Sequence, residues 1–248
     1  MINFFRKIRK KLADDNKPLK YARYAFGEIV LVVVGILIAL SINNWNEQRK
    51  LKAIELKLLE ELYTTIEGDL NLNAYNIQRN ERGIYSAQIL IDNFDKERPY
   101  HDSLNLHFAN ALGRYVALTR NNAYENIKEY GLDFISNDST KLEISWMYET
   151  TINWLKILDD RFALYEYTYM RPKMGLLFKN ISIHTRSMSE DRMAPINYET
   201  LKFNQEFRGI LNNMINNKVE YVIFQKILYD RMQKLLVRIE NEIELKKK

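Results

Sequence analysis

The stretch FGEIVLVVVGILIALSINNWNEQRK, residues 26–50, restricts the fold more than any other part of the chain. No charged residue occurs from Ile29 to Asn46, and Ile29 to Leu40 is almost entirely aliphatic. A transmembrane helix needs about 20 mostly apolar residues. From Tyr24 to Trp45 a helix would rise roughly 31 Å, which matches the hydrocarbon core of a bilayer. We therefore predict a transmembrane helix over residues 25–46, with the lipid bilayer as its partner.

The charges predict the orientation of this helix. Residues 1–46 contain eight basic and three acidic side chains, whereas the other 202 residues contain 29 of each. Because the bases all precede the apolar run, the positive-inside rule assigns residues 1–24 to the cytoplasm as a basic arm. Tyr21, Tyr24 and Trp45 would then lie at the two membrane interfaces. The charge balance of the remainder argues against nucleic acid as a partner.

Two other interpretations of the apolar run stay open at this point. A basic start, a short apolar core and the triplet Ala39-Leu40-Ser41 are also typical of a cleaved signal peptide, although this basic arm is unusually long. A buried helix of a soluble core is the other alternative, but such a helix rarely has a purely basic flank. Retention of the segment would make the chain a single-pass membrane protein with about 200 residues outside the cytoplasm.

One face of the predicted membrane helix suggests self-association. Glu28, Val32, Gly35 and Ala39 recur at intervals of four, three and four residues and so share a face. The pair Gly35-xxx-Ala39 has the small-xxx-small spacing that lets two membrane helices approach closely. An intramembrane carboxylate on that face would point at a partner helix. The alternative is that Glu28 lies at the cytoplasmic interface and reaches water.

Two blocks of the sequence resemble a known family. The stretches FFRKIRKKLADDNK and YAFGEIVLVVVGILIALSINNWNE resemble the N-terminus of bacterial single-pass membrane proteins that are catalogued as a domain of unknown function. That family has an FFRxIRxxL start, a GEIxLVVxGILIAL span and an INxWNE exit. The block NNAYENIKEYGLDFISND, residues 121–138, is similar to a later pattern of the family. The resemblance is closest over residues 4–47, implies an uncleaved anchor and implies no activity.

The rest of the chain predicts an all-α fold. Only 8 glycines and 4 prolines occur in 248 residues, and apolar residues recur every three or four positions. We predict a stalk helix over residues 47–98, with a heptad stripe at Leu70, Ile77, Ile84 and Ile91. Residues 99–248 should form an extracytoplasmic helical domain packed on this stalk, an arrangement favoured over a free coiled coil.

Several boundaries within residues 99–248 follow from capping and breaking residues. Asn122 should be the N-cap of a short helix, with Glu125 as its partner three residues on, and Gly131 should end that helix. A further helix should start at Asn137 or Asp138 and end near Arg171, before Pro172. Residues 182–197 read as a surface loop, followed by helices over 198–217 and from Val219 onward, the latter with Ile223 and Ile227 inward. The helix before Pro172 carries a stripe that fits either a core or a binding groove: Met147, Trp154, Leu158, Phe162, Tyr165 and Tyr169.

The chain offers few residues in patterns typical of catalysis. It has no cysteine, and its three histidines, His101, His107 and His184, do not have the spacing of helical metal ligands. Asp159, Asp160 and Glu166 could be imagined as metal ligands, but adjacent helical residues point apart. We therefore expect no enzyme, no cofactor and no metal site.

Three functions compete on this basis. The first is a membrane-anchored interaction or scaffold protein whose partners are other envelope proteins. The second is a sensor or energy-coupling subunit that conveys a signal across the membrane. The third is an anchored cell-envelope enzyme.

Overall fold

The computed structural model describes residues 18–179 and 192–247. In these ranges every regular element is a helix, and the only extended pairing is an isolated bridge between Phe178 and Pro195. The predicted all-α class is confirmed. The chain divides into two compact units, Met1–Glu55 and Leu56–Lys248, and helix α2 (Pro18–Asp95) contributes to both. The described part of the predicted loop over residues 182–197 contains no helix, and residues 182–191 lie outside the described residues.

The first unit is described only for its part of α2. Its aliphatic side chains are uncovered, since Val32, Leu37 and Ile42 are each more than half exposed. By length and composition, α2 is the one described helix that could cross a membrane, and no residue of its apolar window is buried. This finding is consistent with a single-pass membrane anchor.

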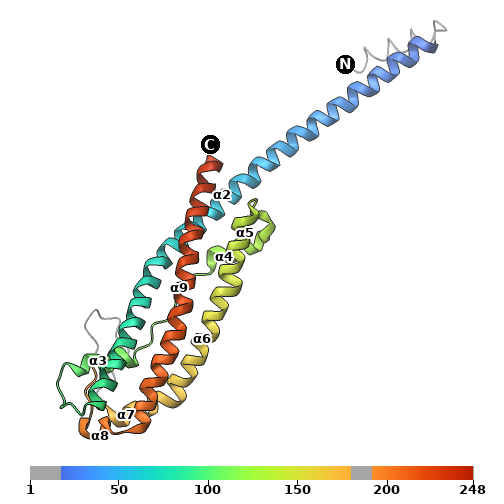
Figure 1. Cartoon of the computed structure of the whole chain (residues 1–248). Helices are drawn as coiled ribbons and strands as arrows, with labels where there is room; N and C mark the ends of the chain where they lie inside the picture. The colour runs from blue at the N-terminus through green and yellow to red at the C-terminus, as the bar shows by residue number, and fades with distance from the viewer. Residues whose placement is uncertain (1–17, 180–191, 248) are drawn as a thin grey trace. The chain divides into compact units, whose positions relative to one another are not determined.

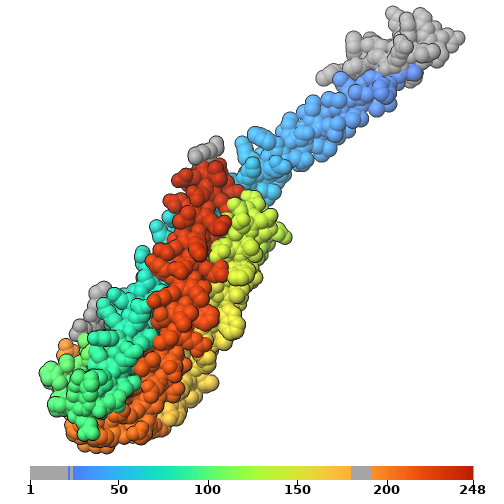
Figure 2. Space-filling view, in the orientation of Figure 1, coloured from blue at the N-terminus to red at the C-terminus, as the bar shows by residue number. Residues whose placement is uncertain are grey.

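Three long helical stretches run side by side in the second unit (Figure 1). They are the Leu56–Asp95 part of α2, the continuous helical rod over residues 138–177 that contains α6 (Ile152–Tyr165), and α9 (Gln205–Lys247). In the space-filling view, the atoms of α6 and α9 form one continuous surface of this unit (Figure 2). Short helices lie at the ends of the bundle: α3 (Leu104–Leu112), α4 (Asn122–Tyr130), the 3-10 turn η1 (Leu132–Phe134), and α8 (Tyr198–Lys202).

The buried seam of α2 is a strict heptad, but it lies one position away from the predicted stripe. Ile77 is buried, whereas Leu70, Ile84 and Ile91 only flank the seam. Its middle is polar, and that composition explains why a search for apolar residues found the flank instead. The seam residues alternate at three and four residues: Leu59, Leu62, Ile66, Asp69, Asn73, Asn76, Asn80, Gly83, Ala87, Leu90 and Phe94.

An aromatic cluster closes one end of the bundle. Phe94 at the end of α2 lies 6.4 Å from Phe108 of α3 and 6.2 Å from Phe207 of α9, measured between ring centroids. Phe178 lies 5.2 Å from Phe108 and completes the group. Rings at these distances contribute beyond the area they bury, so this cluster anchors α3 and the start of α9 to α2.

The helix predicted to end near Arg171 runs further. It forms one rod of five contiguous segments, in which π-helical turns alternate with α-helix: α5 (Asp138–Ser145), η2 (Trp146–Thr151), α6, η3 (Glu166–Met170) and α7 (Arg171–Leu177). Pro172 lies in the first turn of α7. A proline is tolerated there because it directly follows the π-helical turn η3, where the hydrogen-bond register of the rod changes and a missing N–H can be accommodated. Asn137 is the N-cap of α5, and its side chain accepts hydrogen bonds from the backbone N–H groups of Ser139 and Thr140.

Two other predicted boundaries are wrong. The two helices expected over 198–217 and from Val219 are instead the short α8 and a 43-residue α9 that passes through this point without a break. Lys218, the residue between the two predicted helices, is buried within α9. Ile223 and Ile227, which were predicted to point inward, are exposed. The predicted N-cap Asn122 is instead the first residue of α4, and Asn121 occupies the N-cap position without a side-chain cap hydrogen bond. The end of α4 at Gly131 is confirmed, where φ is +88°.

Candidate functional site

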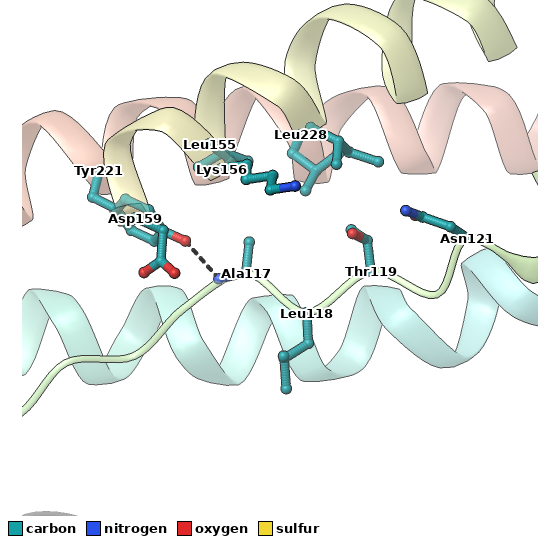
Figure 3. A pocket seen from close by; sticks show the side chains of 10 residues that line it. Ala117, Leu118, Thr119, Asn121, Leu155, Lys156, Asp159, Tyr221 and Leu228 are labelled. Carbon is teal, nitrogen blue, oxygen red and sulfur yellow. Dashed lines mark hydrogen bonds between the residues drawn. The ribbon is translucent and has the colours of Figure 1, made fainter. Parts of the chain in front are cut away.

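The linker between α3 and α4, residues 113–121, passes through the bundle between α2 and α6 (Figure 3). It belongs to no helix, so its peptide groups lack the partners that a helix would supply. Buried peptide groups without partners are costly, and side chains of the neighbouring helices must therefore hold this segment. This demand explains the polar middle of the α2 seam.

Helix α2 supplies three asparagines to the linker. Nδ2 of Asn73 donates to the Leu118 carbonyl at 3.1 Å, and Nδ2 of Asn76 donates to the Val116 carbonyl at 2.7 Å. Nδ2 of Asn80 donates to the Tyr115 carbonyl at 2.6 Å. The spacing of three and four residues puts all three amides on one face of α2.

Asp69, one step earlier on the same face, accepts from Arg120 of the linker. Its carboxylate receives both the backbone N–H and Nε of Arg120, each at 2.8 Å. Asp69 is buried, while the Arg120 side chain is largely exposed. This ion pair therefore attaches the end of the linker to α2 at the surface of the bundle.

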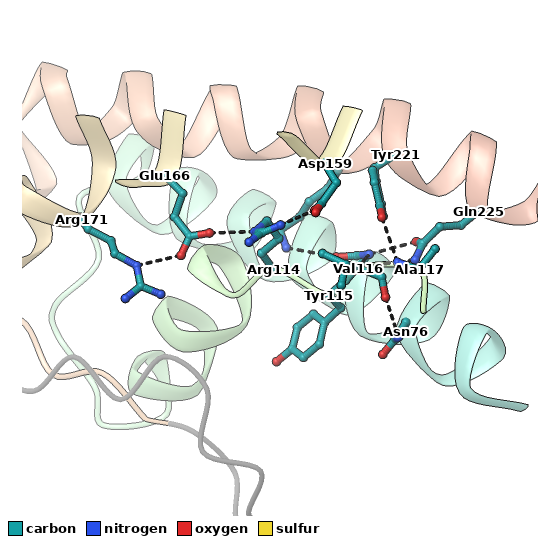
Figure 4. A network of polar contacts seen from close by, with 12 residues as sticks. Asn76, Arg114, Tyr115, Val116, Ala117, Asp159, Glu166, Arg171, Tyr221 and Gln225 are labelled. Carbon is teal, nitrogen blue, oxygen red and sulfur yellow. Dashed lines mark hydrogen bonds and ion pairs between the residues drawn. The ribbon is translucent and has the colours of Figure 1, made fainter. Parts of the chain in front are cut away.

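Helix α9 holds the linker from the other side (Figure 4). The Tyr221 hydroxyl accepts from the Ala117 amide N–H at 2.8 Å, and burial raises the pKa of this phenol, which therefore stays protonated at neutral pH. Oε1 of Gln225 accepts from Asn80 at 3.0 Å, while its Nε2 donates to the Tyr115 carbonyl at 3.4 Å. The linker thus joins α2 to α9 through hydrogen bonds rather than through apolar contact.

Lys218 is the most unusual of these side chains. It is 1% exposed, it donates to the Gly113 carbonyl, and its Nζ lies 3.5 Å from Oδ1 of Asn80. Burial lowers the pKa of Lys218 to about 7, and the cations Arg79 and Arg114 act in the same direction. Burial therefore disfavours the charged form of this amine.

An ion cluster around Arg114 joins the linker to α6, η3 and α7 (Figure 4). Arg114 of the linker pairs with Asp159 of α6, and its Nε donates to Glu166 of η3 at 2.8 Å. The other oxygen of Glu166 accepts from Nε of Arg171 at 2.9 Å. Glu166 is 1% exposed, so two guanidinium groups are needed to compensate its desolvation.

The imagined metal ligands have other partners here. Asp159 and Glu166 lie on either side of the Arg114 guanidinium, which places a cation where a metal would have to lie. Asp160 is exposed, and the described residues contain no group of three ligand side chains that could hold a metal ion. Among the histidines, His101 contacts Ser103, and His107 contacts Ser86. His184 lies outside the described residues.

The aromatic stripe belongs partly to the core. Met147, Leu158 and Phe162 are buried, whereas Trp154 and Tyr169 are exposed. The π-helical turns shift the register, so a stripe drawn at regular helical spacing drifts off the buried face. Trp154 instead stacks on Phe224 of α9, with 6.4 Å between ring centroids.

The predicted membrane residues lie in the first unit. Val32 and Ala39 are exposed, a Cβ added at Gly35 would meet no atom within 4 Å, and Glu28 is half-buried. Val32, Gly35 and Ala39 are therefore uncovered by the described residues, whereas Glu28 is partly covered. Trp45 is 63% exposed, with the Arg49 guanidinium 5.4 Å from its ring centroid. Tyr21 and Tyr24 belong to α2, but their side chains are not among those that the structure describes.

A cleft of about 310 Å³ opens between the linker and α6 (Figure 3). Sequence reasoning missed both the cleft and the linker that forms its wall. The available signal was the recurrence of Asn73, Asn76 and Asn80 at seam positions of a helix, where asparagine has poor helix propensity and needs a partner. The lining residues are Ala117, Leu118, Thr119, Asn121, Ile152, Leu155, Lys156, Asp159, Tyr221 and Leu228.

The comparisons with known proteins concern α2. The model of a family of unknown function (DUF6090) matches residues 28–96. This range starts later than the resemblance at residues 4–47 and extends further, through the whole polar seam. No curated protein and no solved structure matches the chain. From Glu28 to the end of α2, the chain is similar to an uncharacterised family, and that similarity assigns no activity.

Proposed function

We propose that this chain is a single-pass protein of the bacterial inner membrane, with its N-terminus in the cytoplasm and its helical unit outside. The carrying observation is the contrast between the two units. The apolar window of α2 has no buried residue, whereas the second unit has a closed core and equal numbers of acids and bases follow Asn46. Exposed aliphatic surface on this scale needs a lipid environment, since its hydration costs about 25 cal/mol per Å².

Cysteine labelling tests this topology, because the natural chain has no cysteine. Asn153→Cys places a thiol on the exposed surface of α6, and Asn16→Cys places one in the basic arm. In spheroplasts, a membrane-impermeant maleimide should label the first variant directly and the second only after permeabilisation. Labelling of Asn16→Cys in intact spheroplasts would overturn the orientation. A mature protein that begins near Ile42 would overturn the retained anchor.

We further propose that the outer unit acts without catalysis, as an interaction or scaffold module for other envelope proteins. Support comes from the outer surface of α6 and α9, where Trp154, Ile157, Ile223 and Ile227 are exposed. The ion cluster fits this role, because its carboxylates hold arginines rather than a reactive group. A photo-crosslinking residue at Ile157 should give a discrete partner adduct, whereas one at the exposed Gln78 of α2 should not. Equal or absent adducts at both positions would count against this surface.

The second candidate function is a sensor that conveys ligand binding across the membrane. The cleft favours it, because the linker that forms the wall of the cleft is hydrogen-bonded to α2, the helix that contains the apolar segment. Ligand-dependent cross-linking between single cysteines placed in the apolar segment would support this role over a passive scaffold.

A further inference from the structure

The cleft beside the linker is lined by both polar and aliphatic side chains. The side-chain tips of Thr119 and Asn121 of the linker and Lys156 of α6 turn toward the same space (Figure 3). Aliphatic side chains of α6 and α9 complete the lining, namely Ile152, Leu155 and Leu228. A cleft of about 310 Å³ is at the small end of the range for ligand sites and suits a small organic molecule.

The three polar side chains have capacity to bind. Within the described part of the chain, none of them has a side-chain hydrogen bond or ion pair, and Asn121 occupies the N-cap position of α4 without using its amide as a cap. The ammonium, the hydroxyl and the amide all supply hydrogen-bond donors. Thr119 and Asn121 can also accept, but the Lys156 ammonium can only donate, and three donors around one space favour an anionic or carbonyl oxygen on the ligand.

The charges of the cleft favour an anion. Asp159, which also lines it, is compensated by its ion pair with Arg114, so Lys156 is the uncompensated charge of the lining. A single ammonium with two neutral donors matches a carboxylate, which offers two acceptor oxygens. A phosphate ester would carry nearly twice the charge and would call for more cations or a row of backbone N–H groups.

We propose that the cleft binds a small organic monocarboxylate with an aliphatic body, the carboxylate at Lys156, Thr119 and Asn121 and the body against Leu155 and Leu228. The carboxylate can come from a free acid or from the C-terminus of a peptide, which present the same group. The inference concerns the cleft alone and holds for either role proposed above.

Calorimetric titration of the full chain in lipid nanodiscs tests the proposal with two probes. We expect saturable binding of 4-methylpentanoate, of N-acetyl-leucine, or of both, and at least tenfold weaker binding of the matching amides. Binding of N-acetyl-leucine alone would identify the peptide C-terminus as the source, and binding of 4-methylpentanoate alone the free acid. If neither acid saturates, or if the amides bind as tightly as the acids, the proposal is wrong.

Variants locate the binding. Lys156→Met should weaken it at least tenfold and Thr119→Val severalfold, whereas Lys234→Met, at an exposed position of α9, should leave it unchanged. A helical circular dichroism signal and thermal midpoint equal to those of the natural chain establish that each variant folds. Thr119→Val changes little in shape and so remains informative if Lys156→Met is unstable. Unchanged binding in both cleft variants would place the ligand elsewhere and overturn the proposal.

Discussion

Replacement of Gly83 by alanine should destabilise the second unit, although alanine is the better helix former. In an exposed helix the exchange would gain about 1 kcal/mol. At Gly83, an added Cβ would lie 2.7 Å from the Asn110 carbonyl oxygen and 2.9 Å from both Cε and Nζ of Lys218. Asn110 belongs to α3, whose backbone is fixed, and Lys218 is held at the Gly113 carbonyl. Neither neighbour can retreat without losing hydrogen bonds.

The expected magnitude follows from these two effects. Overpacking a closed core costs typically 1–3 kcal/mol, and here a buried amine is displaced as well. We expect Gly83→Ala to lower the free energy of unfolding by about 1–2 kcal/mol after the gain in helix propensity is included. Gly209→Ala in α9 is the matched control, because its added Cβ would meet no atom within 4 Å. That variant should be more stable, by up to about 1 kcal/mol.

Urea denaturation of the full chain in detergent, followed by the fluorescence of Trp146 and Trp154, measures both variants. The prediction is a pair of opposite signs, which a general effect of alanine on helices cannot produce. If Gly83→Ala is as stable as the natural chain or more stable, then α3 and Lys218 do not approach α2 as described. The account of the linker would fall with it.

The remaining predictions concern charge and association. Between pH 6 and pH 9 the unfolded chain binds more protons than the folded chain at Lys218. The free energy of unfolding of the natural chain should therefore rise by about 2–3 kcal/mol over this range relative to that of Lys218→Met, as measured by urea denaturation of both proteins at each pH. If the free energies of unfolding of the two proteins depend on pH in the same way, Lys218 is not a buried titrating amine. Glu166→Gln should cost about 1–3 kcal/mol, because the partly exposed Arg114 and Arg171 lose a charged acceptor while Arg114 keeps Asp159, and a midpoint within error of the natural chain would argue against this pairing. In native membranes, Val32→Cys should form disulfide-linked dimers that Gly35→Leu weakens and that Leu37→Ala, on another face, leaves intact; equal cross-linking in both backgrounds would assign the face to lipid.

The sequence by itself determined the features that depend on short-range pattern. The uninterrupted aliphatic run identified the only described helix able to cross a membrane. The scarcity of glycine and proline identified the all-α class. Asn137 and Gly131 marked real helix ends, because a cap is a local hydrogen bond or a local backbone angle. Each of these signals lies within a few residues and needs no knowledge of what packs against it.

The tertiary structure alone decided which face of α2 is buried and what the cleft is made of. Asn73, Asn76 and Asn80 lie outside the apolar stripe that the sequence predicts, yet they belong to the inward seam, because a non-helical linker lies against them and its carbonyls need donors. Lys218 read as the break between two helices and proved to be buried in one. Polar side chains become interior only when distant peptide groups meet them, and that meeting is a property of the assembled bundle rather than of any stretch of sequence.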